Sequence, residues 1–156
     1  MRGLAFFALT VLVTGCTGDS KALRIEQLDP DGWLQLSIDL SPHLRRSLSA
    51  GVPLTFRLDF RDGNSATTTL RELRYSPLSG RYQVREPTIG YSRSYDSRAA
   101  ALSALERWPV TLTAGAEQFQ ARVWLETSRL PAPLVLPSLF DSRWRLDSGS
   151  WHVGQR

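Results

Sequence analysis

The chain has 156 residues, 42% of them hydrophobic, and a formal net charge of +4. That is the size of one globular domain, and it is too hydrophobic for a wholly disordered chain. A single cysteine excludes a disulfide framework, and one cysteine with two histidines excludes the usual zinc sites.

The first sixteen residues have the layout of a secretory signal. Arg2 precedes an apolar run over residues 4–13, and the small residues Thr14 and Gly15 follow it. The run is about half as long as a membrane-spanning helix needs to be. A buried N-terminal helix is the alternative interpretation.

Residues 13–16, Val-Thr-Gly-Cys, resemble the lipobox of bacterial lipoproteins. The resemblance implies that residues 1–15 are a cleaved signal peptide and that Cys16 is lipidated with acyl chains such as palmitate. Thr17 rather than Asp follows the cysteine, which favours the periplasmic face of the outer membrane. The inner membrane, or a soluble periplasmic protein with an incidental cysteine, is the alternative.

Residues 16–32 are expected to hold the lipidated cysteine and a polar tether, ending in a turn at residues 29–32, Asp-Pro-Asp-Gly. One domain then spans residues 33–156. Its apolar residues recur mostly at every second position, which is typical of half-buried strands.

Two short helices interrupt this pattern. The first covers about residues 42–50, with Ser41 as its cap and Gly51 at its end, and the second covers about 97–108. The alternation slips near Arg71, which predicts a bulge there. In chain order, strands are expected at 33–40, 52–61, 67–76, 81–86, 88–95, 110–114 and 119–127, with short segments near 144–146 and 151–153.

These elements predict a mainly β (α+β) fold. We expect an antiparallel sheet or two-layer β-sandwich of seven to nine short strands, with the two helices closing an edge or an end.

The sequence has no recognisable catalytic signature. Its histidines are His43, expected on the exposed side of the first helix, and His152, near the end of the chain. There is no nucleophile elbow and no phosphate-binding glycine loop. We therefore expect no enzyme activity, no cofactor and no metal.

One candidate binding surface lies on the polar side of two strands. Arg57, Arg61 and Arg122 occupy outward positions, and Trp124 shares a face with Arg122. Such a surface suits phosphate, an anionic lipid headgroup or an acidic partner. The alternative is that each arginine is simply solvated, because acidic residues lie between them. Nucleic acid is not expected as a partner of an exported protein.

A second candidate is the proline-interrupted stretch that begins at residue 130. It contains Leu130, Pro131, Pro133 and Leu134, and it is too apolar for a solvated loop. The stretch either caps the core or presents an exposed patch to a partner.

Four stretches are distinctive when they are taken together. They are residues 51–56, 73–82, 125–134 and the closing Trp144, Ser148 and Trp151. Together they resemble an uncharacterised proteobacterial family, a domain of unknown function in small exported proteins. The resemblance implies a signalling partner, because such proteins are often encoded beside a membrane sensor histidine kinase of the nitrogen-regulation type. It brings no catalytic or ligand residues.

The sequence thus predicts a lipid-anchored, periplasm-facing, non-catalytic module that binds a protein partner, such as the periplasmic region of a sensor kinase. One alternative is a carrier or sensor of a small amphiphilic ligand or anionic lipid, held between sheet and helices. Another is an envelope hydrolase, which would need a histidine beside a serine and a carboxylate.

Overall fold

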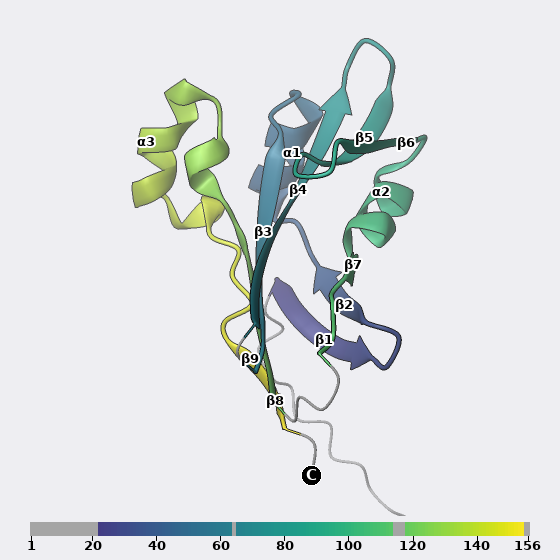
Figure 1. Ribbon diagram of the computed structural model, residues 1–156. Helices are drawn as coiled ribbons and strands as arrows, with labels where there is room; N and C mark the ends of the chain where they lie inside the picture. The colour runs from purple at the N-terminus through teal and green to yellow at the C-terminus, as the bar shows by residue number, and fades with distance from the viewer. Residues whose placement is uncertain (1–21, 64, 114–117, 155–156) are drawn as a thin grey trace, which may run out of the picture.

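The computed structural model describes residues 22–63, 65–113 and 118–154, and its strands form two antiparallel sheets (Figure 1). The larger sheet has the strand order β6-β5-β4-β3-β8-β9, and the smaller has the order β1-β2-β7. The expected mainly β architecture is confirmed. The strands are β1 (Leu23–Asp29), β2 (Trp33–Ile38), β3 (Leu54–Asp62), β4 (Ser65–Ser76), β5 (Arg81–Glu86), β6 (Tyr91–Tyr95), β7 (Arg107–Pro109), β8 (Gln118–Leu125) and β9 (Trp151–Gly154).

The core lies between the large sheet and a layer made of the small sheet and α2 (Arg98–Leu105). Strand β1 contacts β8, while α2 packs on β4, β5 and β6. The inward residues of the central strand β3 are fully or almost fully buried, as its period of two predicts. They are Leu54, Phe56, Leu58 and Phe60.

The two expected helices are present. In α1 (Pro42–Ser49) the Ser41 hydroxyl accepts a hydrogen bond from the Leu44 amide at 3.3 Å, and Gly51 follows the helix with φ +87°. Helix α2 ends at Leu105, three residues before the expected end. Trp108 is instead buried in β7, which pairs with β2.

Part of the expected tether is a strand. Leu23 and Ile25 are buried, and β1 pairs antiparallel with β2 through the predicted turn at residues 29–32. Gly32 has φ +77°, and a Cβ on it would lie 2.6 Å from the Val110 carbonyl oxygen, so the turn requires glycine. The ordered domain therefore includes β1 and does not begin at residue 33.

The bulge expected near Arg71 is absent. The β3–β4 register runs without a shift from Leu54↔Leu73 to Asp62↔Ser65, and Arg71 simply occupies an inward position. The irregularity lies in β1, between Ile25 and Gln27.

The proline-interrupted stretch is largely a helix, α3 (Ala132–Phe140), and not an irregular loop. Short 3-10 turns flank it, η1 (Thr127–Arg129) and η2 (Ser142–Trp144), the latter where a strand segment was expected. The strand expected at 110–114 is also absent: residues 110–113 are irregular, and residue 114 lies outside the described residues.

The proposed signal peptide and Cys16 also lie outside the described residues. Within the described ranges, no helix combines the length and the apolar character needed to cross a membrane.

Candidate binding surfaces

Three of the predicted surface residues come together on the outer face of the large sheet. Arg57 of β3 pairs directly with Trp124 of β8, and Arg122 lies two residues before Trp124 on the same face. The guanidinium carbons of Arg57 and Arg122 lie 5.1 and 5.2 Å from the centre of the Trp124 ring. Each contact is a cation–π interaction, worth about 0.5–1 kcal/mol at an exposed site.

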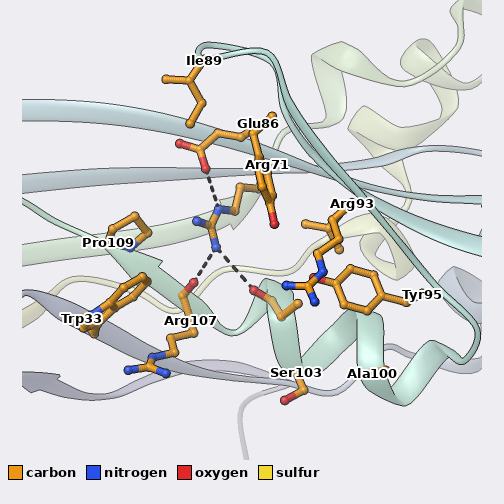
Figure 2. Close-up of a pocket in the computed structure, with 13 residues that line it drawn as sticks. Trp33, Arg71, Glu86, Ile89, Arg93, Tyr95, Ala100, Ser103, Arg107 and Pro109 are labelled. Carbon is orange, nitrogen blue, oxygen red and sulfur yellow. Dashed lines mark hydrogen bonds and ion pairs between the residues drawn. The ribbon is translucent and has the colours of Figure 1, made fainter.

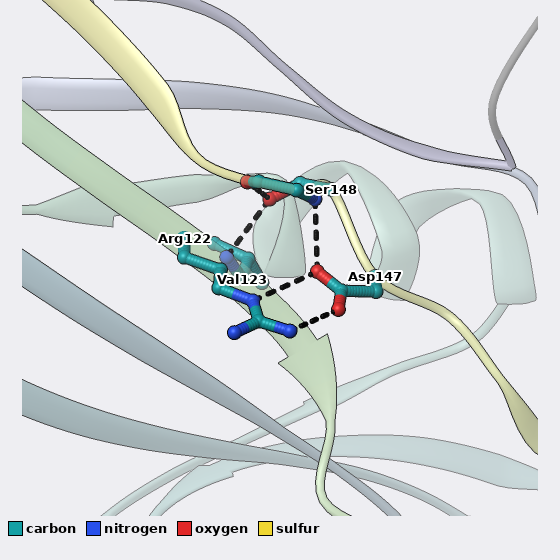
Figure 3. Close-up of polar contacts among 5 residues, drawn as sticks. Arg122, Val123, Asp147 and Ser148 are labelled. Atoms are coloured by element: carbon teal, nitrogen blue, oxygen red, sulfur yellow. Dashed lines mark hydrogen bonds and ion pairs between the residues drawn. The ribbon is translucent and has the colours of Figure 1, made fainter.

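The charges of these arginines are largely balanced by neighbouring carboxylates. Arg57 lies 3.1 Å from Asp59 and 3.8 Å from Glu126. Arg122 binds both carboxylate oxygens of Asp147, at 3.1 and 2.5 Å (Figure 3). The surface around Trp124 is therefore a platform of paired ions and not a strongly basic field.

The chain segment that holds Asp147 runs alongside β8. The Val123 amide donates to the Ser148 hydroxyl at 2.9 Å (Figure 3). The Ser148 amide donates to the Val123 carbonyl, also at 2.9 Å. The Gly149 amide donates to Asp147 at 2.8 Å. These bonds fix the carboxylate that orients Arg122 beside Trp124.

Arg61 lies farther along β3 and is exposed. It lines a shallow pocket of about 260 Å³ together with Asp59, Arg122 and Trp124. Arg61 thus lies beside the other predicted arginines, but it makes no cation–π contact with Trp124 as Arg57 and Arg122 do.

The side chains of the proline-interrupted stretch divide between core and surface. Leu130 is buried and Leu134 packs against the core, whereas Pro131 and Pro133 are exposed. Three further apolar side chains of the same stretch are also exposed: Leu136 at 69%, Leu139 at 52% and Phe140 at 86%.

Helix α3 and Trp124 form one continuous surface. Leu139 and Trp124 line the same hollow, of about 260 Å³, with Trp144 and Arg145 beside them. Positions 136, 139 and 140 have helical spacing and therefore share one side of α3. We call the set Arg57, Arg122, Trp124, Leu136, Leu139 and Phe140 the Trp124 surface.

The two histidines have different surroundings in the fold. His43 is half-buried and its ring meets that of Trp144 edge to face at 4.8 Å, so it is not on an exposed side of α1. His152 is exposed on β9. Among the described residues, no hydrogen bond joins either histidine to a serine or a carboxylate, and no group of three acidic, histidine or cysteine side chains is arranged for a metal.

A larger site lies on the other side of the large sheet. It is a pocket of about 700 Å³ between α2, the β2–β7 edge and the inner face of β4, β5 and β6 (Figure 2). We call it the α2 pocket. Aromatic side chains (Trp33, Tyr91, Tyr95), apolar ones (Val84, Ile89) and three arginines (Arg71, Arg93, Arg107) line much of it.

Arg71 and Glu86 form a buried ion pair in the α2 pocket. Their side chains are each 10% exposed, and the Arg71 Nε donates to Glu86 at 3.1 Å. Arg71 Nη1 also donates to the carbonyl oxygens of Ala104 and Arg107 (Figure 2). The Arg71 charge is thus fully engaged within the protein.

Arg93 and Arg107 are different, because no carboxylate among the described residues pairs with either. Arg93 lies 5.7 Å from the centre of the Tyr95 ring, and Arg107 lies 4.6 Å from that of Trp33. Burial, with a contribution from Tyr91, raises the pKa of Tyr95.

No pattern in the sequence had predicted the α2 pocket. One signal was present: Arg71 and Glu86 are oppositely charged residues at inward positions of neighbouring strands. Aligning the two strands would have paired them. The contributions of α2 and β7 depend on packing between distant segments, which no local pattern encodes.

The model of a family described as a domain of unknown function (DUF4390) matches residues 33–154. No curated protein and no solved structure matches the chain.

Proposed function

The chain belongs to this family of domains of unknown function, and we propose from its own geometry that it is a non-catalytic binding module that takes a protein partner on the Trp124 surface. The observation that carries the proposal is the exposure of Leu136, Leu139 and Phe140 on one side of α3. A cluster of exposed apolar side chains is a common mark of a protein–protein contact.

The hollow between Trp124 and Leu139 gives the partner a place to anchor. An apolar side chain inserted there would be covered by the Trp124 ring and by α3, which is the arrangement typical of an interface hot spot. Because Arg57 and Arg122 are already paired with carboxylates, apolar and stacking contacts carry the binding. Affinity is therefore expected to change little with salt.

We further propose that the module is exported and lipid-anchored at Cys16, on the periplasmic face of the outer membrane. The support is the lipobox-like sequence at residues 13–16. Cys16→Ser is expected to abolish incorporation of an alkyne-labelled palmitate and to move the protein from the membrane to the soluble fraction. Unchanged labelling in this variant would exclude Cys16 as the acylated residue.

The proposed partner is the periplasmic region of a membrane sensor kinase, as the family resemblance implies. The test is photocrosslinking in intact cells, with a photoreactive phenylalanine analogue in place of Phe140. The control is the same analogue in place of Leu78, an equally apolar and fully exposed side chain on the β4–β5 turn.

The Phe140 probe is expected to give one discrete adduct, identified as the kinase by mass spectrometry, and the Leu78 probe is expected to give none. Trp124→Ala should remove the adduct while leaving the amount of protein unchanged. The proposal fails for this surface if both probes crosslink alike, and it fails for this partner if the adduct persists in cells that lack the kinase.

A further inference from the structure

We propose that the α2 pocket binds a small organic acid with a flat, apolar body, whose carboxylate is held by Arg93. This site is separate from the proposed partner surface. Arg71 is the β4 partner of Phe56, so its side chain lies on the inner face of the large sheet. Arg57 and Trp124 lie on the outer face. Occupancy of the pocket and docking of a partner can therefore be tested independently.

The size and lining of the pocket suit a small molecule. Its volume of about 700 Å³ falls in the range of about 300–1,000 Å³ that is common for ligand sites. The wall formed by α2 is made of the small side chains Ala100, Ser103 and Ala104, so the space in front of the helix is left open (Figure 2). Facing it are the rings of Tyr91 and Tyr95, with Trp33 at the β2–β7 edge.

The net positive charge of the side chains that line the pocket favours an anionic ligand. Of its four charged side chains, Arg71 and Glu86 neutralise each other. Arg93 and Arg107 remain as two guanidinium groups without a carboxylate partner among the described residues. Arginine binds a carboxylate through two parallel hydrogen bonds, and its planar group also stacks on a flat ring.

Arg93 is the better placed of the two to hold the carboxylate. Its guanidinium extends beside Tyr95 toward the interior of the pocket (Figure 2). The Tyr95 hydroxyl, which is protonated at neutral pH like that of any tyrosine, can add a hydrogen bond. Arg107 lies over Trp33 at the other end, where it widens the flat surface available to the ligand body.

Ligand chemistry is tested with three probes: 2-naphthoate, its uncharged isostere 2-naphthamide, and acetate as the headgroup alone. Binding is measured by equilibrium dialysis against the full-length protein in lipid nanodiscs, with empty nanodiscs subtracted to remove partition into lipid. Naphthoate is expected to bind saturably below about 1 mM, the range of a weak but specific site. Naphthamide is expected to bind at least about tenfold more weakly, since it lacks the charge that strengthens the hydrogen bonds to Arg93. Acetate should not bind measurably.

Three variants locate the site. Arg93→Gln is expected to reduce naphthoate affinity about tenfold or more and to leave naphthamide unchanged. Ser103→Trp, on the exposed side of α2, should fill the pocket and abolish binding of both. Arg85→Gln is the matched control, because Arg85 lies on the neighbouring strand but pairs with Glu72 on the opposite face of the sheet, and it should bind as the wild type does.

The inference is wrong if naphthoate does not bind saturably, or if Ser103→Trp leaves its binding intact. If naphthamide binds as well as naphthoate, or if Arg93→Gln has no effect on naphthoate affinity, the inference that the ligand is an acid held by Arg93 is wrong. Partner crosslinking from position 140 does not involve these residues. A negative binding result for the pocket therefore does not contradict the proposed partner surface, and a negative crosslinking result does not contradict the pocket.

Discussion

At the scale of single residues, Glu106 joins α2 to the small sheet. It caps α2, its carbonyl oxygen accepts from the Leu36 amide at 2.8 Å, and its carboxylate accepts from the Ile38 amide at 2.9 Å. Burial raises the pKa of Glu106 above its ordinary value of 4.5, although the Ile38 hydrogen bond opposes this shift. One half-buried carboxylate therefore makes stability depend on pH.

The direction of that dependence follows from proton linkage. Because the folded state holds the proton of Glu106 more tightly than the unfolded chain, its contribution to stability is fully present below about pH 4.5 and is lost as pH rises through the folded pKa. Glu106→Gln keeps an acceptor for Ile38 but removes the titration. In urea unfolding between pH 4 and pH 7, the wild type should lose stability relative to Glu106→Gln. Parallel curves for the two proteins would contradict the assignment.

At the scale of elements, α3 is a helix that the sequence did not predict. Prolines at 131, 133 and 137 indicate a broken segment, yet Pro131 precedes the helix and Pro133 lies in its first turn, where a missing amide costs nothing. Only Pro137 interrupts the hydrogen bonding. Packing of Leu130 and Leu134 against the core offsets that local penalty, so a tertiary contact decides the conformation.

Pro137→Ala is expected to stabilise α3. Alanine restores a backbone donor in the helix interior, where proline costs about 3 kcal/mol, against a loss of about 0.4–1 kcal/mol from a more flexible unfolded chain. Hydrogen exchange at residues 138–140 should therefore slow. Pro133→Ala is the control and should give no such slowing, because proline suits the first turn. Equal effects of both substitutions would show that the proline ring at 137 carries no strain.

Strand prediction succeeded wherever a period of two coincided with burial, as in β3 and β8. It missed β1, because Arg24, Glu26 and Gln27 made the segment look like a solvated tether, although Leu23 and Ile25 already alternate with them. The strand expected at 88–95 began too early, because Ile89 lies in the β5–β6 turn and is 70% exposed. Of the site, alternation predicted that Arg57 and Trp124 share an outward face if β3 and β8 are neighbours, but their direct pairing depends on the strand register. The exposed side of α3 could be identified only once the segment was known to be a helix.

At the scale of the whole molecule, Arg71 ties the two layers together. It belongs to the large sheet, yet it donates to backbone carbonyls of Ala104 at the end of α2 and of Arg107 in β7, and its guanidinium lies 4.9 Å from the centre of the buried Trp108 ring. The same side chain pairs with Glu86 at the floor of the α2 pocket. The connection between layers and the shape of the pocket therefore depend on one ion pair.

Breaking that pair should destabilise the entire fold. Arg71→Met leaves the buried Glu86 carboxylate without its partner, which should lower the free energy of unfolding by about 3–5 kcal/mol. The double variant Arg71→Met/Glu86→Leu should lose less stability than Arg71→Met alone, because no buried charge remains. The matched control lies on the same two strands but on the opposite face: Arg85 and Glu72 are 3.7 Å apart and more exposed, so Arg85→Met should cost less than about 1 kcal/mol. Urea unfolding of the full-length protein measures all three. Equal losses for Arg71→Met and Arg85→Met would mean that the layers are held together by apolar packing alone.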